Sequence, residues 1–126
     1  ENNFFEKYES ENELTGSWLM SGIERQGEMR SRNVNQPRKT MKILAGGRFQ
    51  WVAYDTSKKG FYGTGGGYYS TIDGTYTENI EFFSRDSNTV GNSLKFDYEI
   101  IEGDWHHKGF SSKGDPKYEI WTQRKK

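Results

Sequence analysis

The chain has 126 residues, and its 18 Lys and Arg balance its 18 Asp and Glu, so the formal net charge is zero. This length fits one domain, and the neutral charge argues against a generic nucleic-acid binder. The absence of cysteine excludes disulfides, thiolate metal sites and cysteine nucleophiles. No stretch approaches the roughly 20 apolar residues of a membrane-spanning helix, so no integral membrane segment is expected.

The apolar residues of the chain are mainly aromatic. Eight Phe, eight Tyr and four Trp outnumber the 14 Leu, Ile and Val residues. Fifteen Gly and only two Ala disfavour long helices, whereas Tyr, Phe, Trp and Thr are typical of strands. Each aromatic side chain can bury about 150–250 Å². The composition therefore predicts an all-β domain whose core is built largely of rings.

Apolar stretches separated by turn residues predict eight strands. Residues 1–13 are acidic and are expected to form an N-terminal tail or a short helical lead-in, and residues 125–126 a C-terminal tail. The domain between them, residues 14–124, begins with a strand at 14–23 and a long polar loop at 24–39. The basic run of this loop, which continues to Lys42, is expected to be solvated. The remaining strands are expected at residues 40–44, 48–55, 63–70, 75–83, 93–101, 105–110 and 117–124.

Short links between consecutive strands favour an antiparallel up-and-down meander. Gly46-Gly47 and Asp73-Gly74 predict tight hairpin turns. A meander of eight strands closes naturally into a barrel, because closure removes every exposed strand edge. We therefore predict a single eight-stranded antiparallel up-and-down β-barrel.

Alternation along each strand indicates which side chains point into the barrel. The inward face of residues 93–101 is expected to carry Leu94, Phe96, Tyr98 and Ile100. In residues 75–83, a carboxylate shares its face with apolar residues: Tyr76, Glu78, Ile80 and Phe82. Trp105 and His107 likewise share one face. The glycines at 65–67 either permit a sharp bend or leave room for a ligand.

Several short motifs carry a family resemblance. Gly16-Ser17-Trp18, on the first predicted strand, resembles the Gly-x-Trp signature of lipocalins and the wider calycin group. Four further motifs accompany it: Gly47-x-Phe49-x-Trp51, Gly66-Gly67-x-Tyr69, Tyr76-Thr77-Glu78-x-Ile80-Glu81 and Glu119-x-Trp121. Together they resemble an uncharacterised family of small secreted bacterial lipocalin-like proteins. The resemblance implies a ligand-binding barrel, often exported to the periplasm, the cell surface or the medium, with no assigned reaction.

The same resemblance implies structural roles at the closed end of the barrel. Trp18 is expected to be a central packing residue there, and Gly16 to allow close approach of the chain. Arg124, on the last strand, is a candidate to stack on the Trp18 indole. On the last strand, either Tyr118 and Ile120 or Glu119 and Trp121 face inward. Similarity to fatty-acid-binding barrels, which present a polar-x-aromatic pair to the ligand, favours Glu119 and Trp121.

A binding site is predicted inside the barrel. Glu78 and His107 lie on strands separated by one other strand, so their backbones are expected about 10 Å apart. A buried carboxylate needs a partner, so Glu78 is either held ionised by His107 or kept neutral by burial, and the sequence does not choose between these states. The residues expected to line one cavity are Trp51, Tyr69, Glu78, Trp105, His107, Glu119 and Trp121.

Three functions fit these residues. The leading one is the binding of a small, partly apolar ligand in an aromatic-lined interior. The second is an enzyme that uses Glu78 and His107 as acid and base. The third is a filled barrel that acts as a structural or interaction module. No cofactor and no nucleic-acid partner is expected. A metal site is not expected either, because the adjacent His106 and His107 point to opposite faces of a strand.

Overall fold

A computed structural model describes residues 12–111 and 113–124 of the chain. The strands are β1 (Gly16–Arg25), β2 (Glu28–Ser31), β3 (Arg38–Ala45), β4 (Arg48–Asp55), β5 (Gly60–Ile72), β6 (Thr75–Phe83), β7 (Ser93–Ile101), β8 (Asp104–Phe110) and β9 (Pro116–Gln123). A short 3-10 helix, η2 (Ser87–Thr89), lies between β6 and β7. Of the expected N-terminal tail at residues 1–13, residues 1–11 lie outside the described residues, as does the expected C-terminal tail at 125–126.

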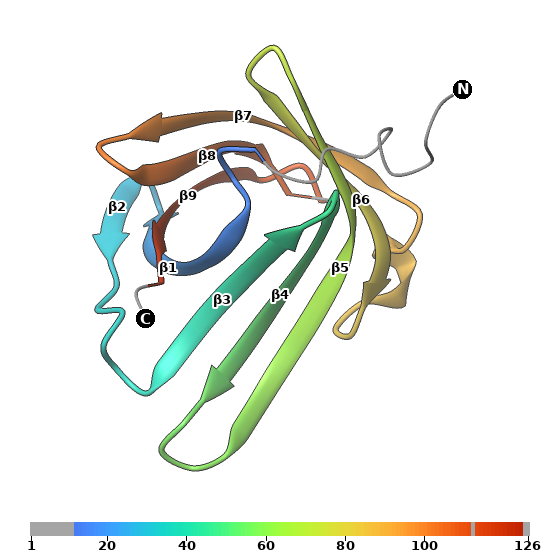
Figure 1. Ribbon diagram of the computed structural model, residues 1–126. Helices are drawn as coiled ribbons and strands as arrows, with labels where there is room; N and C mark the ends of the chain where they lie inside the picture. The colour runs from blue at the N-terminus through green and yellow to red at the C-terminus, as the bar shows by residue number, and fades with distance from the viewer. Residues whose placement is uncertain (1–11, 112, 125–126) are drawn as a thin grey trace.

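The strands pair in an antiparallel ladder that closes on itself. From β3 to β9 each strand pairs with the next, and β1 pairs with both β3 and β9. The closed ring therefore contains eight strands, β1 and β3 to β9, while β2 extends from β1 as a ninth (Figure 1). The predicted eight-stranded up-and-down barrel is confirmed.

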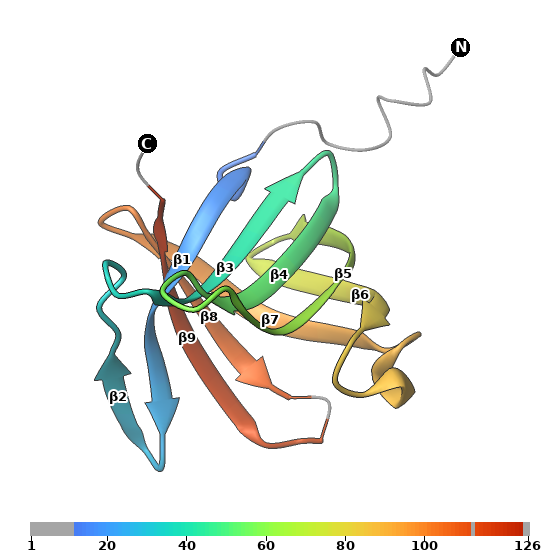
Figure 2. The same ribbon diagram turned by 90° about the horizontal axis from the view of Figure 1, so that it is seen from below.

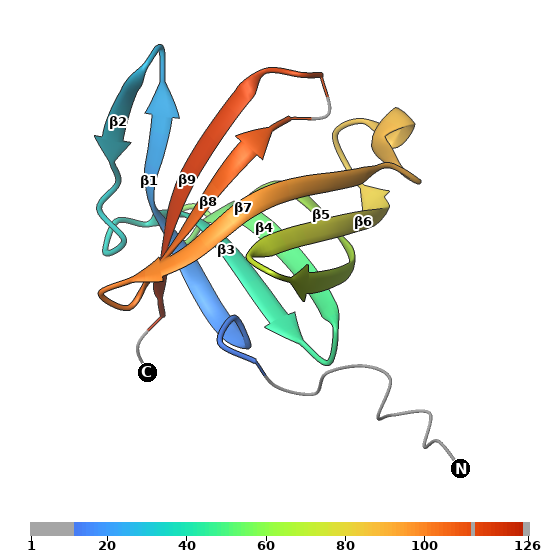
Figure 3. The same cartoon turned by 90° about the horizontal axis from the view of Figure 1, so that it is seen from above.

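The two ends of the barrel differ in their connections. At one end, two-residue turns join β3 to β4, β5 to β6 and β7 to β8. Both residues of the Asp73-Gly74 turn have positive φ, the geometry that matches the twist of a tight hairpin. The other end carries the longer connections, and the β1–β2 hairpin and the β8–β9 connection project together there (Figures 2 and 3). We call these the closed end and the open end.

The predicted loop at residues 24–39 is partly strand, which corrects the expectation. β1 continues to Arg25, a turn at Gln26-Gly27 follows, and β2 pairs back onto β1. Both turn residues have positive φ. All four residues of β2 are exposed, so no alternation of apolar and polar residues marks this strand in the sequence. Its backbone pairing, rather than burial, defines it.

The core consists mainly of aromatic side chains at the closed end. The buried cluster contains Leu14, Trp18, Met20, Leu44, Phe49, Tyr69, Tyr76, Ile80, Phe96, Trp105 and Trp121. Phe96 is 2% exposed, whereas its neighbour Asp97 is exposed, which confirms the inward face predicted for β7. Asn12 extends this end, because its side-chain amide donates to the Tyr69 hydroxyl at 3.0 Å.

A bulge in β6 reverses the predicted facing of its last residues. Gly66 pairs with Phe82 but Gly67 pairs with Ile80, so Glu81 is an extra residue in the ladder. An extra residue shifts the alternation by one. Phe82 is consequently 42% exposed, and Phe83 packs against the core in its place. The expectation that Phe82 faces inward was wrong for this reason.

The glycines of β5 permit close contacts at the same place. A Cβ atom on Gly65 would lie 2.6 Å from the Trp51 indole nitrogen and 2.9 Å from the Phe83 ring. A Cβ atom on Gly67 would collide with the carbonyl oxygen of Asn79 across the bulge. These positions therefore allow neighbouring rings and a bent ladder to fit against the strand. Of the two roles considered for these glycines, the structure supports the bend.

Candidate functional site

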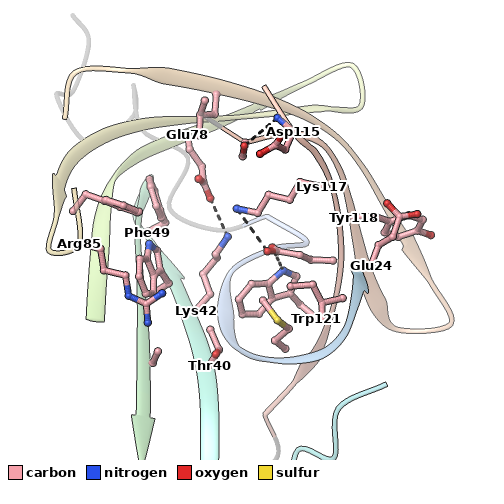
Figure 4. A pocket seen from close by; sticks show the side chains of 18 of the residues that line it. Glu24, Thr40, Lys42, Phe49, Glu78, Arg85, Asp115, Lys117, Tyr118 and Trp121 are labelled. Atoms are coloured by element: carbon pink, nitrogen blue, oxygen red, sulfur yellow. Dashed lines mark hydrogen bonds and ion pairs between the residues drawn. The ribbon is translucent and has the colours of Figure 1, made fainter. Parts of the chain in front are cut away.

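A cavity of about 490 Å³ opens at the open end of the barrel (Figure 4). Its apolar lining includes Met20, Ile23, Phe49, Trp51, Ala53, Ile80, Phe83, Leu94 and Trp121. Its charged lining consists of Glu24, Arg25, Arg32, Arg38, Lys42, Glu78, Arg85, Asp115, Lys117 and Glu119. The barrel is thus filled by its own aromatic side chains at the closed end and hollow at the other.

The residues predicted from the sequence divide between these two regions. Those that line the cavity are Trp51, Glu78, Glu119 and Trp121. Those that lie in the packed interior without lining it are Tyr69, Trp105 and His107. Trp105 is wholly buried, with its indole edge against Trp18 at a centroid distance of 5.6 Å. The structure therefore does not unite all of the predicted residues in one cavity wall.

The floor of the cavity carries a buried ion pair that the sequence reasoning missed. Lys42 Nζ lies 2.9 Å from Glu78 Oε2, and the Tyr76 hydroxyl donates to the same oxygen at 2.9 Å. Figure 4 shows the Lys42 and Glu78 side chains pointing toward each other. Burial alone would raise the pKa of Glu78, but Lys42, Lys117 and the hydrogen bonds outweigh it and lower that pKa. Of the two states considered for Glu78, the ionised one is therefore favoured, with Lys42 as its partner instead of His107.

Lys42 is 4% exposed, so its expected place in a solvated basic run was wrong. It lies on β3 between Thr40 and Leu44, which share its inward face. Aromatic rings surround the ammonium group at distances of 4.7 to 6.0 Å from Nζ to the ring centroids: Trp121, Trp105, Tyr76 and Phe49. Alternation counted outward from the apolar Leu44 was the signal that could have placed Lys42 inside.

His107 is packed as a core ring. It stacks on Phe96 with ring centroids 3.8 Å apart, and both ring nitrogens are without a hydrogen bond among the described residues. Burial lowers the pKa of His107 well below its usual value, and the charges of Lys42 and Lys117 lower it further. A neutral imidazole that is buried beneath the cavity is poorly placed to act as an acid and base with Glu78.

A second acidic group lies on β9, where Glu119 and Trp121 face inward as expected. Glu119 accepts a hydrogen bond from its neighbour Trp121 at 3.2 Å and lies 3.6 Å from Lys117 Nζ. Glu119 raises the pKa of Lys117. Its Oε1 is 4.0 Å from Nε2 of His107. Each interior carboxylate is thus matched to a lysine that also lines the cavity.

The closed end contains the residues to which structural roles were assigned. Trp18 is 1% exposed, and its indole nitrogen donates to the Leu14 carbonyl at 2.9 Å. Gly16 has a φ of 133°, a conformation that disfavours any residue with a Cβ atom. Arg124 is exposed and its backbone N–H donates to Ser17 at 2.8 Å. No cation–π contact within the described residues joins Arg124 to Trp18, so the expected stacking is not present.

The closed eight-stranded ring with an internal cavity defines a lipocalin-like barrel. The chain belongs to the family described as a domain of unknown function, DUF4488, whose model matches residues 13–126. Comparison with curated proteins finds no match. In the described residues, no helix is long and apolar enough to cross a membrane, and no group of three or more His, Asp or Glu is arranged to hold a metal.

Solved structures share this fold at low sequence identity. A lipocalin-like protein from Bacteroides uniformis is 13% identical, with a TM-score of 0.62 over 90% of this chain and 100% of that one. An uncharacterised protein from Bacteroides eggerthii is 14% identical, with a TM-score of 0.57 over 86% and 98%. A redesigned β-barrel is 12% identical, with a TM-score of 0.54 over 90% and 93%. At these identities the likeness concerns the fold alone.

Proposed function

We propose that the protein binds a small, partly apolar molecule in the cavity at the open end. The observation that carries this proposal is the cavity itself, whose volume of about 490 Å³ falls within the range of small-molecule sites. Its walls combine broad apolar surfaces, such as Phe49 and Trp51, with a few fixed polar groups. Such a lining supplies contact area from the rings and orientation from the polar groups.

The polar floor supports a binding role in a further way. Lys42 and Glu78 are buried and paired, so they present a compensated surface rather than an isolated charge. The rings of Trp105 and Trp121 lie beside Lys42, and the Tyr76 hydroxyl donates to Glu78. These contacts hold the two side chains in place before any ligand arrives. A preorganised site loses less conformational entropy on binding.

The proposal is tested with a neutral fluorescent probe, N-phenyl-1-naphthylamine, and a variant that fills the cavity. Ala53 is 3% exposed and lines the cavity, so Ala53→Phe places a ring in the binding space. We expect this variant to bind the probe about tenfold more weakly or worse, a loss of about 1.4 kcal/mol. Ala45→Phe, the same change at an exposed position of β3, is the matched control and should bind like the wild type.

Native mass spectrometry complements the probe. Protein purified from its own host should retain a small molecule that is absent from Ala53→Phe. Equal probe affinity in Ala53→Phe and wild type, or no probe binding together with no retained mass, would refute the proposal.

We also propose that the protein is exported, because its motifs resemble those of small secreted lipocalin-like proteins. Fractionation of the host, followed by detection with an antibody, should find it in the periplasm, at the cell surface or in the medium. Detection in the cytosolic fraction alone would contradict this.

A further inference from the structure

We propose that the ligand of the open-end cavity is an amphipathic anion, whose charged group is bound by Arg25, Arg32 and Arg38 at the cavity rim. We call these three residues the rim arginines. The inference rests on the proposed binding function and adds the chemical class of the ligand to it.

The β1–β2 hairpin brings the rim arginines together. Arg25 ends β1, Arg32 directly follows β2, and Arg38 begins β3, and all three line the cavity. The backbone N–H of Arg32 donates to the carbonyl of Ser21 at 2.8 Å, which anchors the chain after β2 against β1. The Gln26-Gly27 hairpin, and no pattern of burial, is therefore what gathers these charges at one edge of the cavity.

Arg32 is the central member of the three. It is partly buried, and its Nη1 donates to Thr40 Oγ1 at 3.1 Å and lies 3.3 Å from the Met20 sulfur. Thr40 and Met20 themselves line the cavity, so the guanidinium is held against the cavity wall. A guanidinium carries five N–H donors in a planar fork. The contacts with Thr40 and Met20 use only Nη1, and both partners are uncharged.

The rim arginines form no close ion pair with an acid. Burial lowers the pKa of Arg32, and the charges of Arg38 and Arg25 lower it further, while the charge of Glu119 raises it only in part. Asp55, opposite Arg38 in the β3–β4 ladder, is the acid that feels the charge of Arg38. Within residues 12–111 and 113–124, no carboxylate lies within 4.0 Å of any rim arginine, although Glu24 and Asp115 also line the cavity. Gathering three like charges at a partly buried edge is unfavourable, and a bound anion relieves it.

The whole lining shows the same excess of positive charge. It contains six Lys and Arg side chains against four Asp and Glu, whereas the full chain has equal numbers of each. The two interior acids are already matched to lysines, Glu78 to Lys42 and Glu119 to Lys117. Outside these two pairs, the lining holds Glu24 and Asp115 against four arginines, the three rim arginines and Arg85. The excess positive charge therefore comes from arginines, and three of the four lie at the rim.

The neighbouring lining determines the remainder of the ligand. Ile23, Phe49 and Trp51 form apolar wall within the same cavity. A ligand that satisfies both regions has a carboxylate, phosphate or sulfate group at the rim and an apolar body inside. Arg matches planar carboxylates and tetrahedral phosphates or sulfates with paired hydrogen bonds, which are among the stronger ones in proteins.

The test compares two probes that share one aromatic skeleton. The first is 1-anilinonaphthalene-8-sulfonate, which is anionic, and the second is N-phenyl-1-naphthylamine, which lacks the sulfonate. We expect the wild type to bind the anionic probe about tenfold more tightly than the neutral one. Arg32→Gln and the Arg32→Gln/Arg38→Gln double variant should each remove most of this preference without weakening the neutral probe.

Two further variants keep the comparison interpretable. Arg30→Gln removes the same charge from the exposed strand β2, where Arg30 does not line the cavity, so it should keep the wild-type preference. Arg38→Gln alone changes an exposed residue and leaves the Arg32 contact with Thr40 intact. It should therefore fold even if the Arg32 variants do not, and should reduce the preference by at least about threefold.

Competition distinguishes an amphipathic anion from a simple inorganic one. Sodium octyl sulfate should displace the anionic probe, whereas inorganic sulfate at the same concentration should not. Displacement by both ions alike would overturn the amphipathic part of the inference.

The remaining outcomes separate this inference from the function on which it rests. If the neutral probe binds in the cavity but the anionic probe has no advantage, or keeps it in every arginine variant, the rim site is refuted and the binding function stands. If neither probe binds to the wild type and the protein purified from its host retains no small molecule, both are refuted.

Discussion

Lys42 on β3 and Glu78 on β6 form an ion pair of 2.9 Å between strands that are not neighbours in the sheet. The pair therefore connects different walls of the barrel through its interior, directly beneath the cavity. The Tyr76 hydroxyl donates a hydrogen bond to the same carboxylate oxygen of Glu78. Because the pair is almost fully buried, each charge depends on the other for compensation.

Breaking this pair should destabilise the protein strongly. Lys42→Met leaves the Glu78 carboxylate buried without its cation, and we expect a loss of about 3–5 kcal/mol in the free energy of unfolding, measured with urea. The double variant Lys42→Met/Glu78→Gln should lose less than the sum of the two single variants, because the second change removes the charge left unpaired by the first. Additive losses would show that the two side chains act independently.

The exposed pair Arg48–Glu81 offers a control of nearly the same length. Its Nη1–Oε1 distance is 2.8 Å, but both side chains are about half exposed. Arg48→Met should leave the urea midpoint close to that of the wild type, since water screens such pairs. Burial, and not distance, is what makes the Lys42 pair important.

His107 should make the stability depend on pH just below neutrality. Its pKa is well below 6.5 in the folded protein, so below pH 6.5 the unfolded chain binds a proton that the native chain does not. Stability must then fall as the pH falls from about 6.5, with a slope approaching 1.4 kcal/mol per pH unit for this one group. Urea midpoints measured between pH 4.5 and 7 in His107→Gln should lack this component.

Two comparisons check the assignment of that slope. His106→Gln makes the same change one residue away, on the other face of β8, and should retain the pH dependence. Glu78 acts in a different window, because its lowered pKa gives stability that is complete above its ordinary value of 4.5 and is lost as the pH falls through its folded value. A slope between pH 6.5 and 4.5 that survives in His107→Gln would show that another group is responsible.

Trp18 should be the most costly ring to remove at the closed end. Trp18→Ala leaves a cavity beside Trp105 and removes the hydrogen bond to Leu14, so we expect a loss of about 3–5 kcal/mol. Phe61→Ala, at a ring that is 63% exposed, should change the stability by about 0.5 kcal/mol or less. Similar losses in the two variants, measured by chemical denaturation, would contradict the packing at this end.

Gly67 should not tolerate a side chain. Gly67→Ala places a Cβ atom on the Asn79 carbonyl, and since that obstacle is backbone, the β6 bulge must shift; we expect a loss of at least about 1–3 kcal/mol. Gly60→Ala is the control, because there the nearest atom is the flexible end of the Tyr62 side chain at 3.2 Å. A thermal melt of Gly67→Ala that matches that of Gly60→Ala would argue against the bulge.

The barrel and most of its inward faces could be predicted from the order of the amino acids alone. Tight turns such as Asp73-Gly74 are set by the local backbone preferences of two residues, and they appear where predicted. The alternation around Phe96 has a period of two that any paired strand must follow, so it could be predicted without knowledge of the neighbouring strands. Both features depend only on residues that are close in the sequence, so they can be predicted wherever no contact with a distant segment overrides them.

The arrangement of the interior, by contrast, depends on contacts between segments that are far apart in the sequence. The extra residue Glu81 reverses the facing of Phe82 and Phe83, and it is defined by pairing with β5 rather than by the composition of β6. Lys42 lies inside because a carboxylate on a distant strand, Glu78, compensates its charge. The partner of Glu78 is therefore this lysine and not His107, which the sequence had suggested. Such compensation is a property of two segments 36 residues apart. The favourable energy exists only once the barrel has closed around both.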